Sequence, residues 1–209
     1  MFMKDVFFIG NDLVDLCLPE NQAKVQNKRW LNKIFVPAEQ QLIEQATEPN
    51  TMAWLLWSCK ESTYKVAIKQ GMLPNYRPLD FVVELDTPQN HLICAKVHHP
   101  TGVCYTQSAQ NTYFVHSIAA PKAFVLTHGF VHTHKFTDLV DALPTKAWHL
   151  PLLQAIALQY GFDAGTLSIQ KQLHNVPVLC QNGQVLSNFD ISLSHDGVWA
   201  GGIFLNCKL

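Results

Sequence analysis

Two kinds of hydrophobic pattern follow one another along the chain. Apolar positions three and four residues apart favour helices at 21–34, from 37 to about 46, and from 51 to about 70. Before them, the short apolar run VFFIG at 6–10 predicts a buried strand that ends at a glycine. This part of the chain is therefore expected to hold one strand followed by helices.

The pattern then changes to runs of β-branched and aromatic residues, which predict antiparallel strands. These runs, separated by turn-like sequences, lie at 81–86, 91–99, 103–109 and 112–120. A helical pattern returns at 146–160. The segment DISLSHDGVWAGGIFL then predicts a closing hairpin that turns at His195, Asp196 and Gly197.

The order of these elements predicts an α+β fold of two similar halves, each a helix packed on a small antiparallel sheet. The first half is expected at 1–120 and the second at 146–209. Residues 121–145 carry a weaker pattern, which allows another strand in KAFVLTHGFVHTHKF and a helical turn in DLVDALP, and they are interpreted as a linker region.

Composition narrows the class of protein. Hydrophobic residues make up 48% of the 209 residues and charged residues 15%, which suits a packed core and not a disordered chain. The formal net charge of −1 does not indicate nucleic acid or an anionic membrane as the main partner. The start lacks a signal-peptide pattern, and the six cysteines are scattered without close pairs. The sequence therefore predicts a cytoplasmic protein with reduced thiols and no membrane span.

Asp12 is the first candidate for chemistry. It follows the predicted strand at 6–10 directly, in the sequence Gly10-Asn11-Asp12. A carboxylate at the end of a buried strand is rigidly held near solvent, and a glycine beside it lets another group approach the backbone. The same residue also suits an ordinary turn cap, so taken alone it leaves both interpretations open.

The segment WSCKESTYK places charged residues on a helix that is otherwise apolar. Trp57, Glu61 and Lys65 are spaced i, i+4 and i+8, so they share one face. Magnesium prefers one or two carboxylates with phosphate oxygens and waters, and Asp12 and Glu61 are suitable carboxylates. Lys60 and Lys65 are suitable cations for a phosphate. The alternative for this stretch is a surface ion pair beside a core tryptophan.

The segment 190–197, DISLSHDG, carries serine, histidine and aspartate near the C-terminus. Neighbours on an extended chain point to opposite faces, so these adjacent residues do not form a hydrolase triad. A hairpin tip with Ser194 and His195 is instead placed to donate hydrogen bonds to an anion. A plain polar turn is the alternative.

Together, these segments resemble the motifs of the 4′-phosphopantetheinyl transferase superfamily. GNDLVDL resembles the G-x-D-[IV]-V motif of that family, and WSCKESTYK resembles W-x-x-K-E-[AS]-x-x-K. FVPAEQQLI at 35–43 resembles F-T-x-x-E, with Val36 in place of Thr, and DISLSHDGVWAGGIF resembles N-[IL]-S-H-S-G-x-[WY]. The four segments occur in order over almost the whole chain, and their combination is more specific than any single match.

The resemblance implies a magnesium-dependent transferase that moves the 4′-phosphopantetheine group of coenzyme A to a serine of an apo carrier protein, releasing 3′,5′-bisphosphoadenosine. Asp12 and Glu61 would bind Mg²⁺. Glu61, or a water it holds, would take the proton from the carrier serine. Lys65 would contact coenzyme A phosphates and offset charge on the leaving group, and Lys60 would also bind coenzyme A.

The nucleotide end of coenzyme A is assigned by the same resemblance to Ser194 and His195, with His195 near the 3′-phosphate. Two departures concern this family pattern: Val14 stands where many long members carry a third acidic ligand, and Val176 replaces a basic residue before Pro177.

The motif order is that of the short, holo-acyl-carrier-protein-synthase type, whereas the length approaches that of the long type. Residues 146–209 resemble the first half of the long type, which implies a permuted, pseudo-dimeric enzyme whose site lies between two halves of one chain. A trimer is then not required, and a monomer is expected. The carrier would belong to fatty-acid biosynthesis or to a polyketide, polyunsaturated-lipid or peptide synthetase.

Basic residues that would dock an acidic carrier helix cluster between positions 24 and 33, and an ordinary solvated face explains them equally well. They are Lys24, Lys28, Arg29 and Lys33.

Two other functions stay open. A degenerate domain of the same fold would bind coenzyme A or a carrier protein without turnover, although the intact set of acidic and basic residues speaks against it. A zinc hydrolase would use His128, His132 and His134, but no third ligand at convincing spacing accompanies the His132-Thr-His134 pair.

Overall fold

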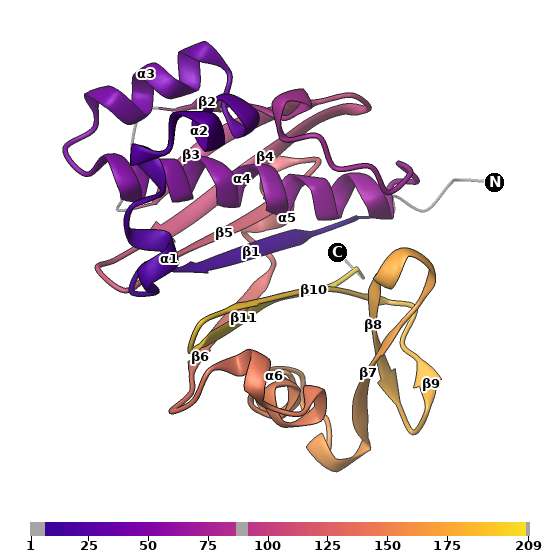
Figure 1. Ribbon diagram of the computed structural model, residues 1–209. Helices are drawn as coiled ribbons and strands as arrows, with labels where there is room; N and C mark the ends of the chain where they lie inside the picture. Colours follow the sequence, from indigo (N-terminus) through magenta and orange to yellow (C-terminus); the bar gives the residue numbers. More distant parts are fainter. Residues whose placement is uncertain (1–6, 87–91, 208–209) are drawn as a thin grey trace.

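In the computed structural model, which describes residues 7–86 and 92–207, helices and antiparallel strands form two layers (Figure 1). The first layer is a five-stranded sheet in the order β1-β5-β4-β3-β2, with α4 across one face. Its elements are β1 (Gly10–Asp15), α1 (Pro19–Gln22), α2 (Lys28–Ile34), α3 (Pro37–Gln45), α4 (Pro49–Lys69), β2 (Val82–Leu85), β3 (Ile93–His99), β4 (Gly102–Gln110), β5 (Phe114–Ala120) and α5 (Ala123–Leu126).

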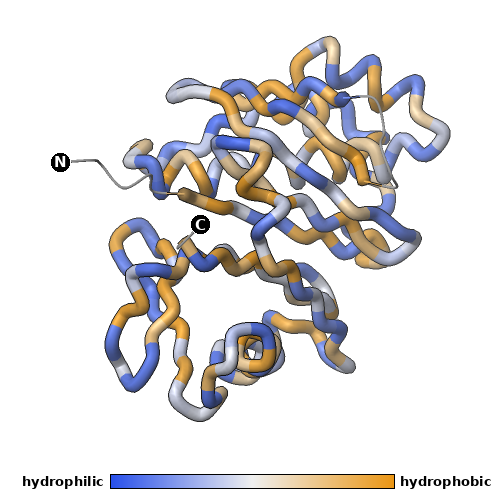
Figure 2. The backbone as a smooth tube through the Cα atoms, turned by 180° about the vertical axis from the view of Figure 1, so that it is seen from behind, coloured by the Kyte–Doolittle hydropathy of each residue, from blue (hydrophilic) through white to orange (hydrophobic). Residues whose placement is uncertain are grey.

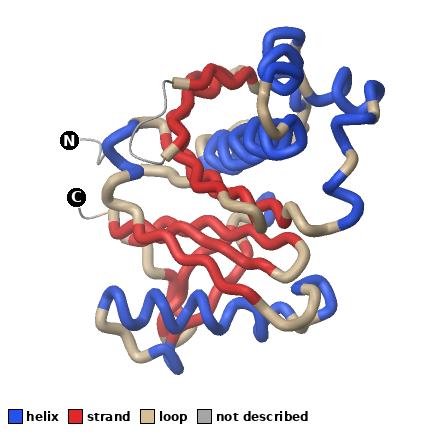
Figure 3. The backbone as a smooth tube through the Cα atoms, turned by 90° about the vertical axis from the view of Figure 1, so that its left-hand side faces the viewer, coloured by secondary structure: helices blue, strands red, loops and turns tan. Residues whose placement is uncertain are grey.

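The second layer contains a three-stranded sheet in the order β10-β11-β6, a small sheet in the order β7-β8-β9, and α6. Its elements are β6 (Phe130–Lys135), α6 (Thr145–Tyr160), β7 (Leu167–Lys171), β8 (Pro177–Gln181), β9 (Gln184–Val185), β10 (Phe189–Asp196) and β11 (Trp199–Asn206). The hydrophilic turns of the β7-β8-β9 sheet lie at the outside of the molecule (Figure 2). The two main sheets lie between α4 on one side and α6 on the other (Figure 3).

The apolar pattern of α4 produces the core of the first layer. Leu55, Leu56 and Cys59 are fully buried and pack with Val97 and Val115 of the sheet. Burying one such side chain contributes roughly 1.5–3 kcal/mol, so this face fixes the helix on the sheet. The helix starts at Pro49, two residues before the predicted start, because proline is favoured in a first helical turn.

A second core surrounds α6. Leu152 and Ile156 of the helix are fully buried against Leu179, Ile191 and Phe204 of the neighbouring strands. Helices and antiparallel sheets were both expected, and the mixed α and β architecture is confirmed. The stronger prediction, that the two layers are equivalent halves, is a matter of internal symmetry and remains a prediction.

The first strand differs from its prediction. Residues 7–9 are outside any strand, and β1 begins at Gly10, where the apolar run was expected to end. The strand therefore contains Asn11, Asp12 and Asp15, all of them buried. Hydropathy placed the strand on the apolar residues, whereas the fold buries polar residues here because partners from other segments satisfy them.

The seam, by which we mean the contact between β1 and β10, joins the two layers. The two strands run in the same direction, and alternate backbone N–H groups from Ile9, just before β1, to Asp15, its last residue, donate to side-chain oxygens of β10. The donor–acceptor pairs are Ile9 to Asp190 at 2.7 Å, Asn11 to Ser192 at 3.0 Å, Leu13 to Ser194 at 3.1 Å and Asp15 to Asp196 at 2.9 Å. Four side chains of one face of β10 thus satisfy an edge that the five-stranded sheet leaves open.

The segment at 121–145, interpreted as a linker region, contains regular structure. It holds α5 and the strand β6, which pairs antiparallel with β11 from Phe130↔Phe204 to Lys135↔Trp199. Strand β6 completes the sheet around the closing hairpin and so belongs to the second layer, whereas α5 packs on the first. No helix in the described part of the chain is long and apolar enough to cross a membrane.

Candidate active site

Close contact between β1 and α4 places the first candidate residue, Asp12. A Cβ atom on Gly10 would overlap the backbone oxygen of Ser62, so the strand approaches this helix only because residue 10 is glycine. The Ser58 hydroxyl, one helical turn earlier, donates to the backbone oxygen of Asp12 at 3.0 Å. The close approach at Gly10 and the hydrogen bond from Ser58 therefore fix Asp12 of β1 against α4.

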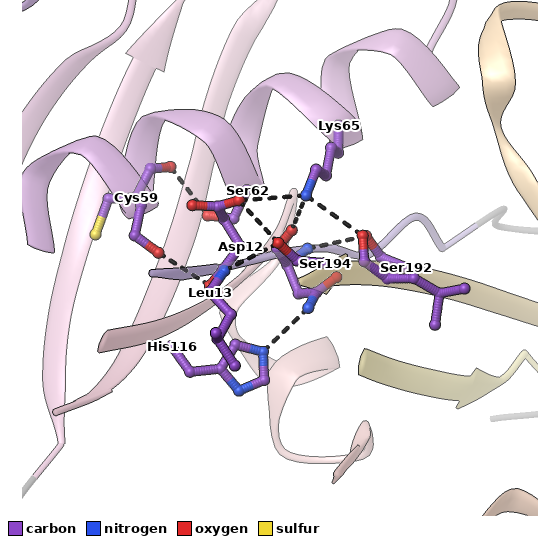
Figure 4. Close-up of polar contacts among 11 residues, drawn as sticks. Asp12, Leu13, Cys59, Ser62, Lys65, His116, Ser192 and Ser194 are labelled. Atoms are coloured by element: carbon purple, nitrogen blue, oxygen red, sulfur yellow. Dashed lines mark hydrogen bonds and ion pairs between the residues drawn. The ribbon is translucent and has the colours of Figure 1, made fainter. Parts of the chain in front are cut away.

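The Asp12 carboxylate lies among side chains of both layers (Figure 4). Its Oδ1 accepts a hydrogen bond from the Ser194 hydroxyl at 3.1 Å and lies 3.4 Å from Lys65 Nζ. Burial raises the pKa of Asp12, while the positive charge of Lys65 and the hydroxyl of Ser194 lower it. The structure thus brings together three of the predicted site residues, one from each of three separate motifs.

Two lysines of α4, one helical turn apart, bridge the seam in the same manner. Lys65 Nζ donates to the backbone oxygens of Asn11 at 2.6 Å and Leu193 at 3.4 Å. Lys69 Nζ donates to those of Ile9 at 2.7 Å and Ile191 at 2.6 Å. Each ammonium group therefore binds one carbonyl at the start of β1 or just before it and one carbonyl of β10.

Lys69 also forms a nearly buried ion pair with Asp190, with Nζ 2.8 Å from Oδ1 and 2.9 Å from Oδ2. This ion pair was not predicted from the sequence. The spacing indicates it, because Lys69 lies four residues after Lys65 and Asp190 shares a strand face with Ser192 and Ser194.

Glu61 is the least satisfied carboxylate of the site. It lies on α4 one turn before Lys65, and among the described residues no hydrogen bond or ion pair reaches it. Burial and, second to it, the negative charge of Asp12 raise its pKa to about 7, although the positive charge of Lys65 partly opposes both. At neutral pH this carboxyl group is therefore poised between its charged and neutral forms.

The donor set fits a divalent cation. Two carboxylates of raised pKa, Asp12 and Glu61, repel each other, and the single nearby charge of Lys65 does not neutralise both. A hard cation bound between them would remove that repulsion, and Mg²⁺ commonly takes one or two protein carboxylates with waters and phosphate oxygens. Within 7–86 and 92–207, no group of three or more His, Cys, Asp or Glu side chains gathers, so ligand oxygens or waters would fill the remaining positions.

Lys60, predicted as a coenzyme A ligand, does not lie with the other predicted residues. Its ammonium group is fully buried on another face of α4 and pairs with Glu39 of α3 at 2.7 Å. The same group donates to the backbone oxygens of Pro78 at 3.1 Å and Phe81 at 2.6 Å. Since all three donors are used inside the first layer, Lys60 holds α3, α4 and the start of β2 together.

His195 lies in β10, two residues before the hairpin loop and not at its tip, because the strand continues to Asp196. Its neighbour Ser194 points into the seam, so the imidazole takes the opposite direction. The ring packs on Trp148 of α6 with centroids 4.8 Å apart, and Nδ1 lies 3.4 Å from Asp141 Oδ1. Burial lowers the pKa of His195, which keeps it mostly neutral near pH 7.

A cavity of about 230 Å³ opens beside the site, between α4 and the β7–β8 turn. Its polar and charged lining includes Lys65, Lys69, His174, Asn175 and Ser192. His174 and Asn175 adopt positive φ angles of 59° and 60°, a conformation that these residue types tolerate better than most. The cavity thus has two lysines at one wall and a tight turn at the other.

The remaining polar clusters lie elsewhere. His132 and His134 line a separate groove against α6. His128 lies apart from them, with its Nδ1 atom 2.9 Å from the backbone oxygen of Phe124. The basic residues considered for carrier docking lie near the N-terminus of the first layer, with Lys28, Arg29 and Lys33 exposed.

Comparison with known proteins identifies one family. The model of the 4′-phosphopantetheinyl transferase superfamily matches residues 8–125, which include β1 and the whole of α4. No curated protein gives a match to the chain. The matched range carries Asp12, Glu61 and Lys65, and it ends before the strand that supplies Ser194.

Proposed function

The chain belongs to the 4′-phosphopantetheinyl transferase superfamily, and we propose that it transfers the 4′-phosphopantetheine group of coenzyme A to a serine of an apo carrier protein in a Mg²⁺-dependent reaction. The observation that carries the proposal is the pair Asp12 and Glu61 beside Lys65. These residues come from the strand and the helix that the family model matches, and they form the partly buried acidic and basic site that phosphoryl chemistry needs.

Glu61 suits the role of general base. Without the cation its pKa is about 7, so this carboxyl group exchanges a proton near neutral pH. The carrier serine oxygen would attack the β-phosphorus of coenzyme A as Glu61, or a water it holds, takes the serine proton. A new serine–phosphorus bond forms, the bond from this phosphorus to the bridging oxygen breaks, and 3′,5′-bisphosphoadenosine leaves.

Asp12 and Glu61 would hold the cation, which when bound offsets the charge of the phosphate oxygens. Lys65 would do the same from the other side, since its side chain is partly exposed and lines the cavity. Ser194 positions Asp12 through the 3.1 Å hydrogen bond to Oδ1.

The cavity between α4 and the β7–β8 turn is the proposed place for coenzyme A. Lys65 and Lys69 supply positive charge there, although Lys69 is already paired with Asp190. His195 does not line this cavity, and its contact with the 3′-phosphate stays a proposal based on the family motif. Val176, in place of a basic residue, contributes only apolar surface to the lining.

The finer assignments follow from the motif order. We infer a holo-acyl-carrier-protein-synthase type in which two permuted halves of one chain form the site, so that the enzyme acts as a monomer in the cytoplasm. The target would be the acyl carrier of fatty-acid biosynthesis or a polyketide, polyunsaturated-lipid or peptide synthetase carrier.

The decisive experiment is intact mass spectrometry of apo carrier proteins after incubation with the protein, coenzyme A and Mg²⁺. We expect a mass gain equal to phosphopantetheine on the carrier serine, and EDTA should prevent it. If several carrier types gain no mass while coenzyme A still binds, the chain is a non-catalytic binding module of the same fold.

Metal binding should depend on pH. The cation binds the deprotonated carboxylates, so protons compete with it below the pKa of about 7 at Glu61. We expect the affinity for Mn²⁺, used as a probe for Mg²⁺, to fall about tenfold for each pH unit below 7 and to level off above it. Titration calorimetry between pH 5.5 and 8.5 measures this. A constant affinity over that range would contradict the assignment of Glu61 as a ligand.

A further inference from the structure

We propose that Tyr76 is a positioning residue for Glu61, and that its hydroxyl donates a hydrogen bond to the Glu61 carboxylate when that carboxylate holds a divalent cation. The inference rests on the metal-binding part of the proposed function and is independent of the transfer step. Neither the sequence motifs nor the family match singles out Tyr76.

The Tyr76 ring packs against two aromatic side chains of α4. After α4 ends, the chain returns along the helix, and the ring lies 5.9 Å from Trp57 and 4.6 Å from Tyr64, measured between centroids. Trp57 comes four residues before Glu61 and Tyr64 three residues after it, so these rings flank Glu61 on one helical face. Tyr76 packs on both of them and therefore covers the face on which Glu61 lies.

The Tyr76 hydroxyl is buried and has no hydrogen-bond partner in the described part of the chain. A buried polar group without a partner lowers the stability of a protein, and the packing of the ring does not require the hydroxyl, because a phenylalanine would make the same ring contacts. Burial raises the pKa of Tyr76, and the charge of Glu61 raises it next, so the hydroxyl keeps its proton and remains a donor.

Glu61 is the complementary group. Its carboxylate has no hydrogen-bond donor among the described residues, whereas Asp12 has Ser194. Carboxylates that bind metal ions are generally held in orientation by a hydrogen bond to the oxygen that faces away from the metal. A buried donor without an acceptor and a carboxylate without a donor thus lie on the same face of α4.

The Tyr76→Phe variant tests the inference, because it removes the hydroxyl and keeps the ring. We expect its affinity for Mn²⁺, titrated by electron paramagnetic resonance without coenzyme A, to fall about 10- to 100-fold. The melting temperature of the metal-free variant should stay equal to that of the wild type or rise, since an unsatisfied buried group has been removed.

The matched control is Tyr160→Phe. The Tyr160 hydroxyl donates to the Phe204 backbone oxygen at 3.3 Å in the second layer, away from the seam. Its loss should lower the melting temperature and leave Mn²⁺ affinity unchanged. Tyr76→Phe is therefore expected to weaken Mn²⁺ binding without lowering the melting temperature. Tyr160→Phe is expected to lower the melting temperature without weakening Mn²⁺ binding.

Wild-type Mn²⁺ affinity in Tyr76→Phe would overturn the inference, and so would a Glu61→Gln variant that binds Mn²⁺ as tightly as the wild type. If Tyr76→Phe weakens Mn²⁺ binding while the wild-type protein modifies no carrier protein, the inference holds and the proposed transfer fails. The two proposals are thus tested separately.

Discussion

The Glu61→Gln variant is expected to lose metal-dependent transfer, with kcat/KM at least about 10³-fold below the wild type. The change removes one of the two proposed carboxylate ligands and, at the same time, the proposed general base. General base catalysis alone typically contributes 10²- to 10⁴-fold, and the loss of the cation adds to it. The rate of carrier mass gain at saturating Mg²⁺ measures the effect.

Unfolding will not explain that loss. Glutamine has the size of glutamate without its charge, so it removes the repulsion between Glu61 and Asp12 that raises the pKa of the Glu61 carboxyl. The melting temperature at pH 8 should therefore be maintained or increased. Glu44→Gln, at an exposed position of α3, is the control and should retain full activity. A Glu61→Gln enzyme with more than a tenth of wild-type activity would refute the assignment.

Lys60→Met is expected to lower the free energy of unfolding by about 3–5 kcal/mol, because it leaves the Glu39 charge buried without its partner. Lys60 and Glu39 are 0% and 1% exposed, and their Nζ and Oε2 atoms are 2.7 Å apart. For a chain of this size, each kcal/mol shifts the melting temperature by about 2–4 °C. Chemical denaturation monitored by tryptophan fluorescence measures the loss.

The double variant Glu39→Gln/Lys60→Met separates a charge effect from a packing effect. It removes both charges, so most of the lost stability should return. Glu39 also accepts hydrogen bonds from the backbone N–H groups of Val36 at 2.9 Å and Val83 at 2.8 Å, and glutamine can replace one of these acceptors. A Lys60→Met loss below about 1 kcal/mol would show that the pair is not needed for the fold.

The Lys60–Glu39 pair also shows a contact that a sequence motif does not reveal. Lys60 and Glu61 are adjacent in the motif, and the resemblance assigned both to the ligand site. A helix turns by about 100° per residue, so neighbours face different environments. The face of Lys60 meets α3, which carries Glu39, and that contact is not readable from the spacing within one helix.

The two long helices and several strands were predictable because local pattern and burial agree in them, whereas the single helix predicted at 21–34 is divided into α1, a 3₁₀ turn and α2. Periodic apolar residues gave α4 and α6, and β-branched runs gave β3, β4 and β5 close to their observed bounds. Asp12, Lys65 and Ser194 were also foreseen as site residues, and the structure brings them within hydrogen-bonding or ion-pair distance.

The start of β1 and the role of β6 were not predictable in the same way. A strand that buries Asn11 and Asp12 has no hydrophobic signal, because its stability depends on Ser192, Ser194 and Lys65 from distant segments. Strand β6 carries His132 and His134 in an otherwise mixed pattern, and its pairing with β11 decides its structure. Tertiary partners override local propensity in both places.

The alternating contacts at the seam have a consequence for how the chain avoids assembling with itself. An uncovered strand edge offers unpaired N–H groups to any extended chain in solution, and such edges promote aggregation. Here β1 is that edge, and the side chains of β10 occupy its donors. A chain interrupted before residue 189, by stalled synthesis or proteolysis, would lack these side chains. It would then present a template to which another copy adds a strand.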